Sequence, residues 1–416
     1  MSPPRERLHL FRAWGIEIEY VIVDRETLDV RPVADQLLRA ASGGDSGDHL
    51  DGPIGWSNEL VLHLVELKCA RPAATLAGLA ESFQASVRRI DHLLEPLGAR
   101  LLPTGMHPWM DPRRETRIWP HEYAEVYQTY DRIFDCKRHG YANLQSTHVN
   151  LPFAGDGEFG RLHAATRLVL PLVPALAASS PVMEGRVTGL LDQRLAVYAA
   201  NSRAIPELAG RVIPEPLFDE ASYRAGILEP LYAALSPHDP DGHLRHEFAN
   251  SRGAIARFDR SAIEIRLLDA QECPRADLAL ALAVGSVVRA LLEERWCSRE
   301  EQERWAVEPL VELLGRTIVH GPGATVADPA FLAAFGRSRA SPRTAGELWL
   351  ELVHEVVRPD PQAAEFLEHL DLVLERGTLA QRILCSLGGS PDRTRLRRVW
   401  RELADCLHEG RSFTDG

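Results

Sequence analysis

The stretch Gly15-Ile-Glu-Ile-Glu-Tyr20 decides how the rest of this sequence is interpreted. Successive side chains of a β-strand point to opposite faces, so Glu17 and Glu19 would leave the same face. Ile16 and Ile18 would leave the other face. Two neighbouring like charges repel, and they suit either a wet outer surface or a site where Mg²⁺, which prefers carboxylate oxygens, neutralises them. The stretch alone leaves both interpretations open.

The same arrangement recurs twice. Glu66 and Lys68 lie two residues apart, and so do Glu264 and Arg266 in Ala262-Ile-Glu-Ile-Arg-Leu267. A polar face that carries both acids and cations is typical of a metal–nucleotide site, because the acids hold Mg²⁺ and the cations meet phosphate oxygens. The repetition favours a site over a solvated surface.

A fourth polar face is predicted in the strand-like residues 146–153. Ser146, His148 and Asn150 alternate with apolar residues and would share one side. A single histidine in a strand is often a hydrogen-bonded structural residue. Here its polar neighbours make a lined cleft an equal alternative.

Charge and hydropathy exclude several classes of function. The 416 residues carry 47 Lys and Arg against 59 Asp and Glu, a formal net charge of −12, and only Lys68 and Lys137 are lysines. Such an acidic chain does not offer the basic surface that nucleic acid requires. The longest apolar region, 168–183, contains three prolines and is shorter than the roughly 20 residues of a membrane span. Residues 1–7 contain no signal-peptide-like apolar stretch, so we expect a cytoplasmic protein without a membrane partner.

The order of predicted elements favours an α+β fold. Strands are predicted over 14–24, 59–68, 146–153 and 261–268, and helices over 75–97, 161–178 and 277–296, with a Gly/Asp/Ser-rich loop over 42–55. Polar residues on one face of each strand indicate a mostly antiparallel sheet. We expect one domain over 1–296 that contains these strands. A helical region over 297–416 would pack on it or form an oligomer contact.

Common nucleotide-binding motifs are absent or weak. Gly155-Asp-Gly-Glu-Phe-Gly160 matches G-x-G-x-x-G, but the strand before it is polar on one face and no acidic-ended strand follows. We interpret it as a loop with Asp156 or Gly157 near a helix start. No glycine precedes a lysine, so any ATP binds without a P-loop.

Several segments together resemble the glutamate–cysteine ligase family, in particular its carboxylate–amine ligase branch. They occur in family order between about residues 14 and 275: Gly15-Ile-Glu-Ile-Glu, Val65-Glu-Leu-Lys, Pro103-Thr-Gly-Met-His-Pro, Thr147-His-Val-Asn, Ala178-Ser-Ser-Pro-Val-Met-Glu-Gly-Arg-Val-Thr-Gly and Ala262-Ile-Glu-Ile-Arg-Leu-Leu-Asp. The resemblance implies a glutamine-synthetase-like catalytic fold. In that fold a curved antiparallel sheet, flanked by helices, forms a cradle for ATP, divalent metals and an amino acid.

The resemblance also implies roles for individual residues. The implied metal ligands are Glu17, Glu19, Glu66 and Glu264, with Glu59 and His148 as weaker candidates. The implied phosphate-binding residues are Lys68, Arg257 and Arg266, of which Lys68 and Arg266 are also the implied catalytic residues. The implied substrate contacts are His148, Asn150 and Arg194. Asn150 stands where the family's His-Val-His element has its second histidine.

The implied reaction is ATP-dependent amide formation through an acyl phosphate, with glutamate and cysteine giving γ-glutamylcysteine for glutathione biosynthesis. Its cofactors would be ATP and two or more Mg²⁺ ions, with Mn²⁺ as an alternative. Two other interpretations stay open. One is the same fold joining glutamate or another carboxylate to a different amine, and the other is a non-catalytic protein that binds a nucleotide or a metal. A homo-oligomer is also open.

Overall fold

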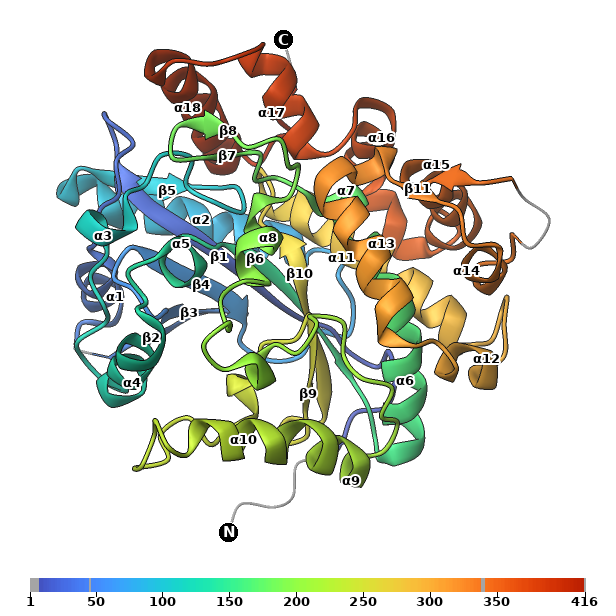
Figure 1. Ribbon diagram of the computed structural model, residues 1–416. Coiled ribbons are helices and arrows are strands. Elements are labelled where there is room, and N and C mark those ends of the chain that lie inside the picture. The colour runs from blue at the N-terminus through green and yellow to red at the C-terminus, as the bar shows by residue number, and fades with distance from the viewer. Residues whose placement is uncertain (1–6, 45, 338–340, 415–416) are drawn as a thin grey trace.

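An eight-stranded sheet forms the centre of the protein. The computed structural model describes residues 7–44, 46–337 and 341–414, and Figure 1 shows its elements. Seven strands follow the order β2-β3-β4-β1-β6-β10-β9, β5 also pairs with β1, and every pair is antiparallel. The strands are β1 (Gly15–Asp24), β2 (Asp48–Asp51), β3 (Ile54–Asn58), β4 (Leu64–Cys69), β5 (Ala99–Leu102), β6 (Ser146–Pro152), β9 (Ala254–Arg257) and β10 (Ala262–Asp269). The predicted α+β fold with an antiparallel sheet is confirmed.

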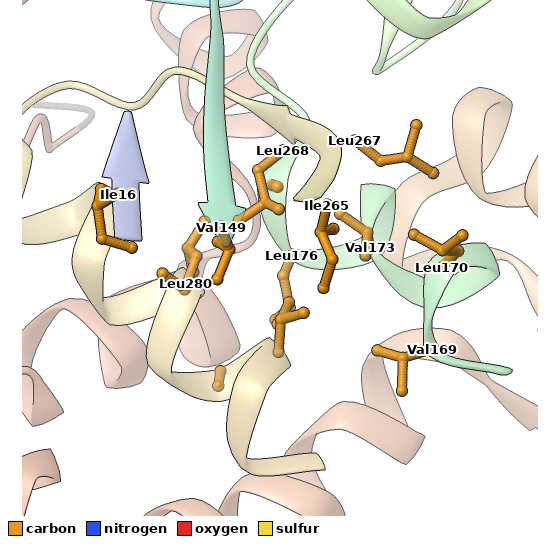
Figure 2. Close-up of a cluster of buried hydrophobic side chains, with 14 of the residues drawn as sticks. Ile16, Val149, Val169, Leu170, Val173, Leu176, Ile265, Leu267, Leu268 and Leu280 are labelled. Atoms are coloured by element: carbon orange, nitrogen blue, oxygen red, sulfur yellow. The ribbon is translucent and has the colours of Figure 1, made fainter. Parts of the chain in front are cut away.

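The apolar face of the sheet forms part of the main core. Figure 2 shows Ile16 of β1, Val149 of β6 and Ile265 of β10 side by side, next to Leu176 of α7 and Leu280 of α11. All five side chains are buried. The strict alternation of apolar and polar residues therefore commits one face to packing and leaves the opposite face for charged groups.

Helices cover this apolar face. α11 packs against α2, α6 and β1, and its Gly285 is needed because a Cβ there would lie 2.3 Å from the ring of Trp14. The helices are α1 (Ala34–Ser42), α2 (Leu79–Leu94), α3 (Pro112–Glu115), α4 (Ala124–Phe134), α5 (His139–Ala142), α6 (Asp156–Val169), α7 (Pro174–Ala177), α8 (Gln193–Tyr198), α9 (Glu220–Tyr223), α10 (Glu229–Leu235), α11 (Pro274–Leu292), α12 (Arg299–Glu303), α13 (Val307–His320), α14 (Pro329–Ala334), α15 (Ala345–Leu352), α16 (Leu367–Arg376), α17 (Leu379–Leu387) and α18 (Arg393–Glu409). Within the described ranges, no helix combines the length and apolar character that crossing a membrane requires.

Two predicted segments near the N-terminus are wrong. The supposed loop over 42–55 contains β2 and the start of β3, joined by a tight turn in which Gly52 takes a φ of +63°. The supposed strand over 59–68 begins only at Leu64, because the chain turns between β3 and β4. β2 is a short, partly exposed edge strand, so its polar composition is indistinguishable from that of a loop.

The other predicted elements are confirmed with shifted ends. The helix predicted over 75–97 is α2 followed by one 3-10 turn, and the helix over 161–178 breaks at Pro171 and Pro174 into α6, a 3-10 turn and α7. α6 begins at Asp156, as the loop interpretation of the glycine-rich motif predicts. β5 was not predicted, because its four residues directly follow a helix.

Residues after 297 are mainly helical, with four further residues in the short hairpin of β11 (Thr325–Val326) and β12 (Arg343–Thr344). Their side chains share the core of the sheet and its covering helices. The Trp349 indole donates to the carbonyl of Leu172 at 2.8 Å. Arg382 forms an ion pair with Glu272 at 2.7 Å, and the side chains of this pair are each 1% exposed. The division into domains at residue 297 stays a prediction. Between α7 and α8 the chain forms a short hairpin of two-residue strands, β7 (Val182–Met183) and β8 (Arg186–Val187).

Candidate active site

Strand register brings the predicted charged residues together on the polar face of the sheet. Glu17 of β1 lies opposite Lys68 of β4 on one side and His148 of β6 on the other, and Glu19 lies opposite Glu66. They line a pocket of about 620 Å³. The predicted residues that line it are Glu17, Glu19, Glu59, Glu66, Lys68, His148, Arg194, Arg257, Glu264 and Arg266.

Three of these residues have the spacing of a metal site. One ligand atom each of Glu17, Glu66 and His148 lies within 4.8 Å of the others. Carboxylate oxygens suit Mg²⁺, and an added imidazole nitrogen also suits Mn²⁺. The donor set therefore fits the divalent cation that the sequence predicts. Glu19 and Glu264 are not members of this group.

Glu17 is held by two residues of β6. His148 Nδ1 lies 3.2 Å from its Oε2, and Asn150 Nδ2 donates to its Oε1 at 3.2 Å. Burial alone would raise the pKa of Glu17, but the hydrogen bond with His148 and the positive charges of His148 and Arg260 together outweigh burial, and the net pKa is lowered. Burial likewise opposes ionisation of His148, and the contact with Glu17 raises the pKa of the imidazole above 6.5. Asn150 thus supports an acid and does not line the pocket.

Glu19 is oriented from the start of β6. Its Oε2 accepts hydrogen bonds from the backbone N–H of Ser146 at 2.7 Å and from the Ser146 hydroxyl at 2.9 Å. The same hydroxyl lies 2.9 Å from His148 Nε2. Ser146 therefore connects Glu19 with the histidine beside Glu17.

Glu66 and Lys68 of β4 form one polar unit with Ser57 of β3. The Lys68 ammonium lies 3.0 Å from Glu66 Oε2, and it donates to Ser57 Oγ at 2.8 Å. Ser57 in turn donates to Glu66 at 2.8 Å. Burial alone would lower the pKa of Lys68, but Glu66 raises it above its ordinary value, so the side chain stays charged.

Two arginines surround Glu264 of β10. Arg266 Nε lies 2.9 Å from its Oε1, and Arg257 of β9 lies 3.3 Å from its Oε2. Against the effect of burial, Arg266 and other nearby charges lower the pKa of Glu264. The register of β10 against β6 shifts between Ile265 and Leu268, so Arg266 lies in a β-bulge, where the regular pairing is interrupted.

Glu59 lines the pocket from the turn after β3, outside the strand in which it was predicted. Burial, followed by the charges of Glu66 and Glu19, raises the pKa of Glu59 well above its ordinary value. Positive charge nearby, such as a bound cation, would favour the ionised form of this carboxyl group.

Arg194, at the start of α8, is anchored inside the protein. Its Nε forms an ion pair with Asp269 at 2.5 Å, and one Nη donates to the carbonyl of Arg266 at 3.2 Å. Both charged side chains are at most 2% exposed. Arg194 also lines the pocket, so a substrate contact would use its remaining nitrogen.

The sequence did not reveal the opposite wall of the pocket. It consists largely of aromatic side chains from α4 and the residue before it, from α5 and α8, and from the 3-10 turn Glu247–Ala249, namely Tyr123, Tyr127, Tyr130, Tyr141, Tyr198 and Phe248. Ser57 and Arg260 were also missed. Aromatic residues at helical spacing look like ordinary core residues, and no sequence signal separates the two cases. The pocket therefore has a charged floor and an aromatic wall, an arrangement that can bind a polyanion with a cation beside an organic molecule.

Two known proteins are similar to this chain in sequence. A protein of Archaeoglobus fulgidus named "Uncharacterized protein" is 31% identical over 399 residues, which cover 96% of this chain and 99% of the relative. A Pseudomonas aeruginosa protein provisionally named glutamate–cysteine ligase 2 is 30% identical over 284 residues, or 68% of this chain and 66% of the relative.

A solved structure and a family model complete the comparison. The glutamate–cysteine ligase of Francisella tularensis, solved in complex with AMP, superposes with a TM-score of 0.61 at 11% identity, covering 97% of this chain and 89% of that one. The model of the family described as "Glutamate-cysteine ligase family 2(GCS2)" matches residues 13–402. The chain therefore belongs to glutamate–cysteine ligase family 2, and the predicted resemblance and ligase class are confirmed.

Proposed function

We propose that this protein is an ATP-dependent carboxylate–amine ligase that joins glutamate to cysteine and forms γ-glutamylcysteine through an acyl phosphate. One observation carries the proposal. Acids with the spacing of a metal site and cations suited to phosphate share one pocket, on one face of a sheet with the fold of a glutamate–cysteine ligase. Family membership supports the ligase class, and the choice of glutamate and cysteine is part of the proposal.

Two nucleophilic displacements make up the proposed reaction. A carboxylate oxygen of the acid attacks the γ-phosphorus of ATP, the bond to the bridging oxygen breaks, and ADP leaves. The amine nitrogen then attacks the acyl carbon, inorganic phosphate leaves, and the nitrogen loses a proton. Neither displacement needs a protein nucleophile, so the protein contributes alignment and charge neutralisation.

The metal ligands in this proposal are Glu17, Glu66 and His148, with Glu19, Glu59 and Glu264 completing the acidic surroundings. Bound Mg²⁺ would supply positive charge against the phosphate oxygens. Lys68 would contact a phosphate oxygen as a compact point charge, whereas the planar guanidinium groups of Arg257 and Arg266 suit bidentate contacts. Arg194 would contact the substrate.

Identification of the product tests the proposal. The purified protein is incubated with ATP, Mg²⁺, glutamate and a panel of amines that includes cysteine, and phosphate release is followed while the products are identified by mass spectrometry. We expect Mg²⁺-dependent ADP formation and a product with the mass of γ-glutamylcysteine. Turnover with a different amine would keep the ligase and replace the substrate.

Two further measurements distinguish a ligase from a protein that only binds a nucleotide. Glu17→Gln keeps the size of the side chain and removes its charge, so we expect it to abolish the Mg²⁺-dependent turnover. Tight ATP binding by the natural protein together with no turnover for any acid and amine would instead identify a non-catalytic binding protein.

A further inference from the structure

Arg260 differs from the other cations of the pocket in having no ion-pair partner among the residues that the structure describes. Lys68 pairs with Glu66, Arg194 with Asp269, and Arg257 and Arg266 with Glu264. Arg260 lines the same pocket and is exposed, and no carboxylate of the described residues lies within 4.0 Å of its guanidinium group. A ligand can therefore bind Arg260 without displacing an acid.

The backbone that carries Arg260 is fixed. It lies in the tight turn between β9 and β10, where its N–H donates to the carbonyl of Arg257 at 3.0 Å. Phe258 anchors one side of the turn, with ring centroids 5.0 Å from Phe159 and 5.5 Å from Tyr223. The N–H of Asp259 donates to Glu247 at 3.1 Å on the other side. These contacts hold the backbone of the turn in place, and the exposed Arg260 side chain extends from it.

The charge of Arg260 acts on the acids at the centre of the pocket. For Glu17, burial raises the pKa and His148 lowers it, and Arg260 adds a further lowering. For Glu264, burial again raises the pKa, and Arg260 acts in the same direction as Arg266. Arg260 lines the pocket together with both of these acids.

We propose that Arg260 is a phosphate-binding residue of this pocket, whose guanidinium group contacts the terminal phosphate of the nucleotide. The inference rests on the proposed function. A guanidinium group binds two phosphate oxygens at once, and it stabilises the charge that spreads over these oxygens during phosphoryl transfer. Arg257 and Arg266 share their charge with Glu264, whereas Arg260 brings a full positive charge to the ligand.

Nucleotide titrations test this contact without requiring turnover. Affinities of ATP, ADP and AMP, each with Mg²⁺, are measured by calorimetry for the natural protein, Arg260→Ala, Arg260→Lys and the control Arg398→Ala. Arg398 is an exposed arginine of α18 that does not line the pocket. We expect Arg260→Ala to bind ATP about tenfold more weakly and AMP unchanged, since one charge-assisted hydrogen bond is lost at the terminal phosphate. Arg260→Lys should recover part of the affinity, and Arg398→Ala should match the natural protein.

Steady-state kinetics locate the contact further. We expect Arg260→Ala to lower kcat/KM for ATP by about 10- to 100-fold and to leave KM for the acid unchanged. A rise in KM for the acid alone would overturn the proposal, because Arg260 would then bind the substrate carboxylate. Equal loss of ATP and AMP affinity, or no loss, would also overturn it. If the natural protein turned over no substrate, the proposed function would fail, and the ATP and AMP titrations would still decide the role of Arg260.

Discussion

Two acids of the pocket should respond to the same substitution with the same loss of activity and different stabilities. Glu17→Gln and Glu264→Gln each remove one negative charge and preserve side-chain volume. Both acids belong to the proposed metal and nucleotide site, so both variants should lose Mg²⁺-dependent turnover. Their neighbours differ, because Glu264 forms ion pairs with two arginines whereas Glu17 contacts His148 and Asn150.

The structure sets the size of the stability difference. The Glu264 side chain is 3% exposed, and removal of one partner from a buried ion pair costs about 3–5 kcal/mol. Arg257 keeps an ion pair with Asp259 at 3.2 Å, and Arg266 is 23% exposed, which reduces the cost to about 2–3 kcal/mol. Gln at position 17 can still accept hydrogen bonds, and relief of the repulsion from Glu264 offsets part of the lost attraction to His148 and Arg260. Glu17→Gln should therefore cost no more than about 1 kcal/mol.

Urea unfolding followed by circular dichroism, in EDTA at pH 7, measures the free energies of unfolding. Phosphate release with Mg²⁺-ATP measures turnover for the same preparations. Equal stability of the two variants would refute the idea that Glu264 holds the arginines in place. Substantial turnover in either variant would refute its assignment to the metal and nucleotide site.

Three further predictions concern stability. Arg382→Met should lower the free energy of unfolding in urea by about 3–5 kcal/mol, because it leaves Glu272 buried and unpaired. Adding Glu272→Gln should restore part of the lost stability. A loss below about 1 kcal/mol for Arg382→Met would contradict the prediction. Protonated His148 should stabilise the fold in EDTA, because the folded state binds the proton more tightly than the unfolded state does. This stabilisation should be complete below pH 6.5 and be lost as pH rises through the raised pKa of His148. Denaturation curves from pH 5.5 to 8.5 should show the loss, and His148→Asn should abolish this pH dependence. Gly285→Ala should lower stability by about 1–3 kcal/mol in thermal and urea unfolding, because its Cβ would lie 2.3 Å from the Trp14 ring, whereas Gly315→Ala, with open space around it, should not.

The fold was predictable where one strand face is apolar and the other is polar. Ile16 and Ile18 alternate with Glu17 and Glu19, and this pattern located β1 and showed which face is buried. β2 escaped notice because an edge strand of four residues buries too little to need apolar side chains. The bulge at Arg266 was also unpredictable, since it arises from pairing between β6 and β10 and leaves no local pattern.

The floor of the candidate site followed from sequence, and its wall did not. Acids two residues apart share a strand face, and antiparallel pairing then places Glu17, Glu66 and His148 together. Tyr130 and Tyr198 come from helices whose position over the sheet depends on tertiary packing. Arg260 gave no signal, because an arginine in a turn follows no periodic pattern in the sequence.

The distribution of ion pairs gives the acids of the pocket two different tasks. Glu66 and Glu264 are paired with Lys68 and Arg266, so a metal ion bound there would compete with the protein's own cations. Within the described residues, Glu17 and Glu19 form no ion pair with lysine or arginine, and they accept hydrogen bonds from β6 instead. A divalent cation that draws on Glu66 would therefore free the Lys68 ammonium, 3.0 Å away, to meet a phosphate oxygen. Metal and nucleotide should for this reason bind with positive cooperativity. The metal ion would take the place of Lys68 beside Glu66, and the phosphate would take the place of Glu66 beside Lys68.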